Sequence, residues 1–234
     1  MPVTYVAERG TAAATQANPA TLSVTSNCVA GNTLILCMGC RDARNLPSGI
    51  TIADSRSNTW NADIEEQDNS LNNYAGIWST RYDGGTLQNG DSLTVTFGTS
   101  PTGPICYMLE EFNGLLISGA LDQTGRAIDD VTTNGATAIC NGPIAQPEEL
   151  GIVAMMVNGG TGVVTRDATW TDFTTSEVLD STNGKTLDAQ YKIITTGGTP
   201  SATYTWSAQG AARVIATYRS VGSAGRPHRM PLGV

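Results

Sequence analysis

The feature that most constrains this chain is an apolar run that occurs twice. The longer copy is residues 150–157 (LGIVAMMV), which the turn residues Asn158, Gly159 and Gly160 follow. Eight apolar residues are too few to span a bilayer. A short run that is apolar on both faces and bounded by turn residues predicts a buried central strand. A second such run, residues 34–41 (LILCMGCR), stands 116 positions earlier.

The rest of the chain repeats in the same order around these two runs. The offset falls from 116 near the start to 106 near the end, and its changes lie in predicted loops, where insertions cost little stability. The matched segments are 8–12 with 123–127, 20–24 with 136–140, 34–41 with 150–157, 57–60 with 167–170, Trp78 with Tyr191, 84–85 with 197–198, 92–97 with 201–206, and 105–112 with 211–218. We therefore predict an internal duplication, with repeat one at residues 3–115 and repeat two at 116–222.

The pattern inside each repeat is that of strands joined by tight turns. Residues 94–97 and 186–194 alternate apolar and polar side chains, as half-exposed strands do. Asn-Gly and Gly-Gly pairs separate these segments and signal turns. With seven or eight strands a repeat and no convincing helix, we predict an all-β protein of two tandem β-sandwich, jelly-roll-like domains.

Charge and targeting signals exclude several classes of partner. The formal net charge is −8, whereas nucleic-acid binding normally needs a basic surface. No apolar stretch is long enough for a membrane helix. The N-terminus lacks a basic region followed by an apolar one, so we expect no signal peptide. We therefore expect synthesis in a cytoplasm and no nucleic-acid or membrane partner.

Five cysteines leave two interpretations open. The odd number precludes complete internal pairing, and synthesis in a cytoplasm favours reduced thiols. The first interpretation is that they are small buried apolar side chains. The second is a disulfide formed between subunits after assembly. The candidate residues for such a bond are Cys28, Cys37, Cys40, Cys106 and Cys140.

Sequence motifs for catalysis or cofactor binding are few. The only histidine, His228, lies near the C-terminus, which removes most nucleophile–histidine arrangements. Adjacent carboxylates on a strand point to opposite faces, so a neighbouring pair cannot flank one glycosidic bond. We expect Glu110 or Glu111 to face solvent or a subunit contact. Asp63 and Asp68 with Asn69, or Asp54 with Asn58, could supply calcium ligands, but no complete calcium loop is present. We predict no enzyme, cofactor or metal.

Aromatic residues divide into core anchors and surface candidates. Trp60, Trp170 and Trp78 recur as aromatic positions in both repeats, which favours the core. Tyr74 and Tyr82 lack aromatic counterparts, so we expect them to be exposed. On a jelly roll they could stack on sugar rings, which keeps a glycan-binding module as an alternative function.

The last twelve residues, 223–234, match nothing in repeat one. They contain two prolines, so they cannot form a regular strand. They are either a frayed tail or an extended basic arm that docks on a neighbouring subunit. The residues of such an arm would be Arg226, Pro227, His228, Arg229, Met230, Pro231 and Leu232.

The ordered series of motifs resembles a known family. It comprises a Gly-Asn-Thr-Leu-Ile start at residues 31–35, Asn-Thr-Trp at 58–60, Ile-Trp at 77–78, a Gly-Gly turn at 84–85, Thr-Val-Thr-Phe at 94–97 and Ala-Thr-Tyr-Arg-Ser at 216–220. Over about residues 20–222 the chain resembles tandem jelly-roll structural proteins of tailed bacteriophage virions and related bacterial surface proteins. The resemblance implies a capsid-decoration, neck, collar or fibre component, made in the host cytoplasm. It also implies binding to copies of itself and to other virion proteins, and it carries over no catalytic residue.

Overall fold

The computed structural model describes residues 1–14, 17–41, 49–68, 73–81, 83–98, 101, 103, 105–129, 135–158, 164–180, 184–206 and 210–222. All regular structure in this part of the chain is β, as the sequence predicts. None of these residues forms a helix that could cross a lipid bilayer.

Each repeat contributes eight strands. Repeat one contains β1 (Thr4–Ala14), β2 (Ala20–Ser23), β3 (Thr33–Arg41), β4 (Thr51–Asp54), β5 (Trp60–Asp68), β6 (Asn73–Arg81), β7 (Ser92–Thr96) and β8 (Ile105–Asn113). Repeat two contains β9 (Leu121–Asp129), β10 (Ala136–Ile139), β11 (Glu149–Asn158), β12 (Val164–Thr165), β13 (Thr171–Asp180), β14 (Lys185–Ile194), β15 (Ser201–Trp206) and β16 (Ala211–Arg219).

The two repeats share one topology. Repeat one forms a five-stranded sheet in the order β1-β8-β3-β6-β5 and a three-stranded sheet in the order β2-β7-β4. Repeat two has the matching orders β9-β16-β11-β14-β13 and β10-β15-β12. A long hairpin folded on itself, as in a jelly roll, pairs its first strand with its eighth, second with seventh and third with sixth. Both repeats contain these three antiparallel ladders, which confirms the predicted fold class.

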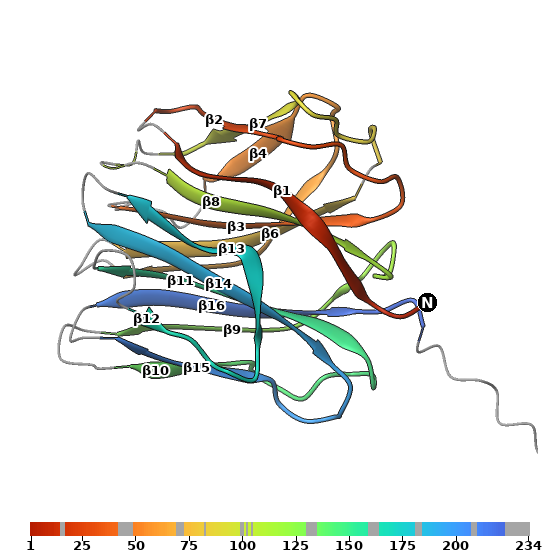
Figure 1. Cartoon of the computed structure of the whole chain (residues 1–234), viewed down its shortest axis with the longest axis vertical. Helices are drawn as coiled ribbons and strands as arrows, with labels where there is room; N and C mark the ends of the chain where they lie inside the picture. The colour runs from red at the N-terminus through yellow and green to blue at the C-terminus, as the bar shows by residue number, and fades with distance from the viewer. Residues whose placement is uncertain are drawn as a thin grey trace, which may run out of the picture.

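The molecule is a stack of four sheets (Figure 1), with the two three-stranded sheets outside and the two five-stranded sheets in the middle. One apolar cluster lies inside each sandwich, and a third joins the two repeats. The third cluster combines Ile35, Ile77 and Met108 of repeat one with Ile152 and Val214 of repeat two. The central sheets are therefore covered on both faces.

Burial on both faces explains the two apolar runs. A half-exposed strand alternates apolar and polar residues, whereas a strand covered on both sides is commonly apolar on both faces. From Thr33 to Cys40 every residue of β3 is buried, and from Glu149 to Val157 every residue of β11 is buried. The prediction of buried central strands is confirmed.

The central sheets are related by an approximate two-fold arrangement. Edge strand β1 of repeat one packs on β13, and edge strand β9 of repeat two packs on β5. The strand at one edge of each sheet thus lies over the opposite edge of its partner. This is the geometry of an isologous dimer interface, in which the same surface of both units forms the contact.

The sequence match between the two apolar runs was shifted by one residue. In the ladders, Leu36 pairs with Trp78 on β6 and with Leu109 on β8, and Val153 pairs with Gln190 on β14 and with Ile215 on β16. Because Leu109 and Ile215 match at the offset of 106 between β8 and β16, Leu36 and Val153 occupy equivalent positions. The structural offset between β3 and β11 is therefore 117 rather than 116. A one-residue slip moves every side chain to the other face of a sheet.

The same slip affected one aromatic pair. Trp78 corresponds to Gln190, and Tyr191 corresponds to Ser79. Trp78 is buried inside the first sandwich, whereas Tyr191 faces the interface between the repeats. The match of Trp60 with Trp170 is consistent with the register, because they stand next to Asn61 and Thr171, which occupy equivalent ladder positions.

Candidate functional site

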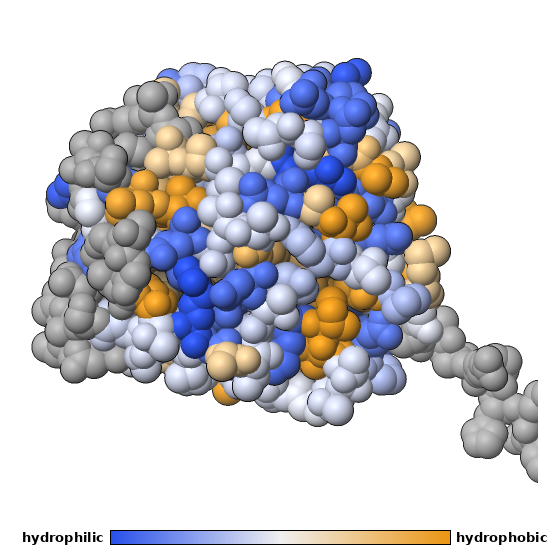
Figure 2. Space-filling view, in the orientation of Figure 1, coloured by the Kyte–Doolittle hydropathy of each residue, from blue (hydrophilic) through white to orange (hydrophobic). Residues whose placement is uncertain are grey.

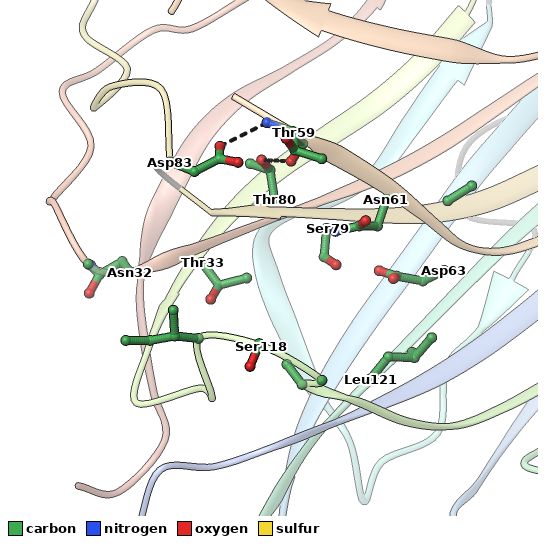
Figure 3. Close-up of a pocket in the computed structure, with 15 residues that line it drawn as sticks. Asn32, Thr33, Thr59, Asn61, Asp63, Ser79, Thr80, Asp83, Ser118 and Leu121 are labelled. Atoms are coloured by element: carbon green, nitrogen blue, oxygen red, sulfur yellow. Dashed lines mark hydrogen bonds between the residues drawn. The ribbon is translucent and has the colours of Figure 1, made fainter. Parts of the chain in front are cut away.

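A pocket of about 730 Å³ opens beside the junction of the two repeats (Figure 3). Its walls come from the start of β3, the paired strands β5 and β6, and the connection from β8 to β9. The lining residues are Gly31, Asn32, Thr33, Thr59, Asn61, Ala62, Asp63, Ser79, Thr80, Asp83, Ile117, Ser118, Gly119, Ala120 and Leu121. The volume lies within the usual range for small-molecule sites.

Figure 3 shows Asp63, Ser79 and Leu121 pointing toward the same space. Asp63 lies at a register shift in β5, between Ala62 and Ile64, and such bulges redirect side chains. Ser79 comes from the neighbouring strand β6, and Leu121 begins β9 of the other repeat. The pocket is therefore built by both repeats together.

The approximate two-fold arrangement places an equivalent region at the other end of the central interface, and aromatic side chains occupy it. Tyr5, Phe112, Phe173 and Tyr191 form an aromatic cluster at that end, with the rings of Tyr5 and Tyr191 5.1 Å apart and those of Phe173 and Tyr191 5.3 Å apart. Offset and edge-to-face ring contacts of this kind add stability beyond area burial.

The ladders identify which residues occupy the equivalent positions at the pocket. Leu121 replaces Tyr5, Tyr218 replaces Phe112 and Ser79 replaces Tyr191. Asp63 and Phe173 are matched by position, because each is the first residue after an equivalent ladder pair, at the start of a register shift. Three of the four aromatic rings are thus exchanged for smaller side chains, two of them polar. This exchange opens the pocket.

The carboxyl of Asp63 lines the pocket and is partly buried. It accepts a hydrogen bond from the hydroxyl of Tyr218, 2.7 Å away, and another from Ser79. Burial raises the pKa of Asp63 to about 6, while these two bonds lower it. The group is therefore an ionisable acceptor held by residues from both repeats.

The rim of the pocket is polar and ordered by local hydrogen bonds. The backbone N–H of Thr59 donates to Asp83 Oδ1 at 2.9 Å, and this bond lowers the pKa of Asp83. The hydroxyl of Thr80 donates to the carbonyl of Thr59. Asn61 and Ser118 are exposed beside them.

The predicted glycan residues lie elsewhere. Tyr74 is only 1% exposed, and its hydroxyl donates to Glu65 inside the first sandwich, so the expectation that it lies on the surface is wrong. Its burial follows from its place on the inner face of β6, against Trp78. Tyr82 lies outside the described residues, as do Arg226, Pro227, His228, Arg229, Met230, Pro231 and Leu232 of the predicted arm.

All five cysteines are buried thiols. Cys37, Cys40 and Cys106 have no exposed surface, and Cys28 and Cys140 are 7% and 4% exposed. Burial raises the pKa of Cys106 and Cys140 to about 12. This favours the interpretation as packing residues, since an intersubunit disulfide would require exposure of a buried sulfur atom.

The expectation that Glu110 or Glu111 faces solvent or a subunit contact is wrong. Both are fully buried, on opposite faces of β8. Glu111 faces the first sandwich, where Arg9, Asn32 and the backbone N–H of Val29 donate to its carboxylate. Neither glutamate therefore has surface with which to contact solvent or another subunit.

Glu110 faces the interface between the repeats. The hydroxyl of Tyr5 donates to its Oε2 atom at 2.9 Å. Burial raises the pKa of Glu110 to about 8. The neighbouring glutamates therefore differ: Glu111 is matched by a cation, whereas Glu110 is stabilised in its neutral form.

The predicted calcium ligands are engaged within the protein. Asp54 accepts hydrogen bonds from Asn58 and from the indole N–H of Trp60. Asp63 is bonded to Tyr218 and Ser79 as described above, and Asn69 lies outside the described residues. Within the described ranges, no group of three or more His, Cys, Asp or Glu side chains is placed to hold a metal ion.

The pocket was not predicted from the sequence, although the sequence contains a signal for it. In the correct register, Asp63 corresponds to Phe173 and Ser79 to Tyr191. An aromatic residue in one repeat and a small polar one in the other marks the place where the two ends of the interface differ. Comparisons of the chain with protein-family models, with curated proteins and with solved structures found no match.

Proposed function

We propose that the chain is a non-enzymatic structural component of a phage virion, of the capsid-decoration, neck, collar or fibre type. It assembles through the surfaces of its β-sandwiches with copies of itself and with other virion proteins. The observation that carries the proposal is the core shared by the two five-stranded sheets. It joins two jelly-roll units into one block, and jelly rolls are a recurrent fold of capsid domains.

The corner where the repeats are connected supports a role in assembly. The first residues, the linker after β8 and the end of β16 meet there, through a bridge from Leu115 to Ser220 and a bond from Val221 N–H to Gly114 O. Met1 and Val221 expose 68% and 38% of their surface at this corner, where Gly222 lies against Met1. Exposed apolar side chains that lie together mark contact sites.

The rest of the visible surface is more divided. On the face shown in Figure 2, apolar patches are small and separated by hydrophilic side chains. With a net charge of −8, such a surface favours solubility before assembly.

The proposal is tested on particles rather than on the isolated fold, because one fold serves many functions. An antibody against the purified chain is applied to particles released from lysed cells that carry the gene. We expect it to label particles at a regular position in electron micrographs. A lysate that contains abundant chain, but only unlabelled particles, would refute the proposal.

The predicted arm has its own test within this proposal. Residues 223–234 follow directly from the apolar corner. A chain lacking residues 224–234 should fold normally but enter particles less efficiently than the full chain. Equal incorporation of both chains would remove the arm from the assembly mechanism.

A glycan-binding module remains the alternative function, but Tyr74 no longer supports it because that residue is buried. Lectin domains also use jelly-roll sandwiches. The observation that favours this alternative is the polar pocket at Asp63.

A further inference from the structure

We propose that the pocket at Asp63 is a binding site for an uncharged saccharide. This goes beyond the structural role, since it concerns a ligand site on the surface of the assembled part. The chemistry of the lining, the absence of the aromatic filling found at the equivalent end, and the position of the polar groups carry the inference.

Leaving the pocket open costs apolar packing between the two repeats. The other end of the same interface is filled by Phe173 and Tyr191. Filling this end in the same way would bury more apolar surface and remove a buried carboxyl from a site where burial disfavours its charged form. The small polar residues Asp63 and Ser79 are therefore a departure from the best packing, and a ligand provides a reason for it.

The polar groups that line the pocket indicate what kind of ligand it could bind. The accessible part of the lining offers hydroxyls from Thr59 and Ser118, the amide of Asn61 and the carboxylate of Asp83. Asp63 and Ser79, which are partly buried, also line the pocket. Hydroxyl and amide groups both donate and accept hydrogen bonds, and carboxylates accept them. A ligand bearing several neighbouring hydroxyl groups matches this set, because each of its hydroxyls also both donates and accepts.

The pocket lining also has an apolar part. Ile117 is 80% exposed at the pocket, and Ala62, Ala120 and Leu121 complete an aliphatic wall. A sugar ring presents C–H groups on its faces and hydroxyls on its edge, so it can contact this wall and the polar groups together. Ligand sites commonly combine apolar walls with a few placed polar groups in this way.

The charge of the pocket lining distinguishes neutral ligands from acidic ones. Among the described residues that line the pocket, two are carboxylates and none is cationic. An anionic ligand such as a uronic acid would be placed beside these carboxylates without a compensating cation. The lining therefore selects uncharged sugars over acidic ones.

The test uses the full chain and a panel of probes in protein-observed NMR titrations. The neutral probes are methyl α-glucoside, methyl α-mannoside, methyl β-galactoside and N-acetylglucosamine, and the acidic probe is glucuronate. We expect at least one neutral probe to shift the amide signals of Asn61, Ser79 and Ser118, with glucuronate binding at least tenfold more weakly, as expected for like-charge repulsion.

Two variants locate the binding. Asn61→Ala removes an exposed amide and should weaken binding about three- to tenfold, the usual effect of losing one neutral hydrogen bond. Ser79→Tyr places at this end the residue that repeat two has in the equivalent position, and should abolish binding by filling the space. The matched control is Thr171→Ala, which changes the residue equivalent to Asn61 at the filled end and should bind as the unmodified chain does.

Three results would overturn the proposal. The first is that no neutral probe shifts signals of the lining. The second is that binding is unchanged in a folded Ser79→Tyr or Asn61→Ala variant, each checked by its NMR spectrum. The third is that a synthetic peptide of residues 223–234 occupies the pocket while every sugar fails, which would make the site a docking site for the arm. None of these measurements requires a particle, so this inference and the structural role can fail separately.

Discussion

At the scale of single residues, neighbouring glutamates in β8 show how the face of a strand determines the chemistry of a side chain. Glu110 has no exposed surface, and its Oε1 atom has no hydrogen-bond partner among the described residues. Its pKa is raised from 4.5 to about 8. In the folded protein it therefore holds its proton over a range of pH in which the unfolded chain has lost it.

This shift predicts how stability depends on pH. Because the folded chain binds more protons than the unfolded chain between pH 4.5 and pH 8, the free energy of unfolding falls as the pH rises through that range. Glu110→Gln should remove this contribution while keeping a partner for Tyr5. Urea unfolding at pH 5 and pH 8 should show a smaller loss of stability in the variant.

The control for this prediction is Asp83→Asn. Asp83 is exposed, and its pKa is lowered, so it is ionised at both pH values in both states. That variant should keep the pH dependence of the unmodified chain. An identical pH dependence in the Glu110→Gln variant would contradict the assignment of a buried neutral carboxyl.

The buried ion pair between Arg9 and Glu111 predicts a large loss of stability when its cation is removed. Arg9 lies at a register shift in β1, which turns its side chain inward to an ion pair with Glu111. Arg9→Met leaves a carboxylate buried without its cation, so we expect a loss of about 3–5 kcal/mol in the free energy of unfolding. Arg126→Met, which removes an exposed partner of Glu66, should cost less than about 1 kcal/mol. Equal losses in the two variants, measured by urea unfolding, would show that the buried pair is not the source of the effect.

At the scale of strands, the two apolar runs show what a sequence pattern can and cannot determine. Their length and turn residues were sufficient to predict strands buried on both sides, and the structure confirms this. Their register could not be read in the same way, because a strand without polar residues gives no information about which face each residue occupies. The offset of 116 therefore looked as good as the true offset of 117.

The pocket could not be predicted from the sequence for a similar reason. Asp63 and Ser79 lie on the paired strands β5 and β6, and Leu121 of β9 joins them only because the two five-stranded sheets pack face to face. The sequence predicted two sandwiches but contained no direct sign of which sheet faces would meet. The outward-facing expectation for Tyr74 failed for a related reason, since the absence of an aromatic counterpart does not reveal the face of a strand.

The contact between β3 and β11 gives a prediction about the sheets themselves. A Cβ atom added at Gly39 would lie 2.8 Å from Sδ and 3.2 Å from Cβ of Met156 in the other repeat. Met156→Ala should cost about 2–5 kcal/mol, because it leaves a cavity over Gly39. Gly39→Ala should also destabilise the protein, because the new Cβ atom would crowd Met156 and lie 3.1 Å from the backbone oxygen of Tyr74.

The double variant tests whether these two residues act on each other. In the Met156→Ala background the clash with Sδ is removed and the new methyl group at Gly39 fills part of the cavity, while the contact with the backbone oxygen of Tyr74 remains. The double variant should therefore be more stable than the sum of the single effects predicts. The measurement is a double-mutant cycle from urea unfolding. Strict additivity would contradict direct packing between the repeats.

At the scale of the whole molecule, the duplication resembles a dimer joined by its own linker. The edge strands β1 and β5 of repeat one cover β13 and β9 of repeat two, and the apolar cluster between the central sheets draws residues from both. The two ends of this approximately symmetric arrangement differ. One end has an aromatic cluster with Tyr5 and Tyr191, and the other has the pocket with Asp63 and Ser79.

If the central sheets share a core, the repeats should not be stable apart. Residues 1–115 and 116–222 produced separately would each expose one face of a five-stranded sheet to water, at a cost of roughly 25 cal/mol for each Å² of apolar surface. We expect each piece alone to self-associate or aggregate, and the two together to form a complex with a single unfolding transition. Size-exclusion chromatography and calorimetry measure these outcomes. Two monomeric pieces that each unfold cooperatively without the other would contradict this prediction, because the central cluster would then contribute little to the stability of either repeat.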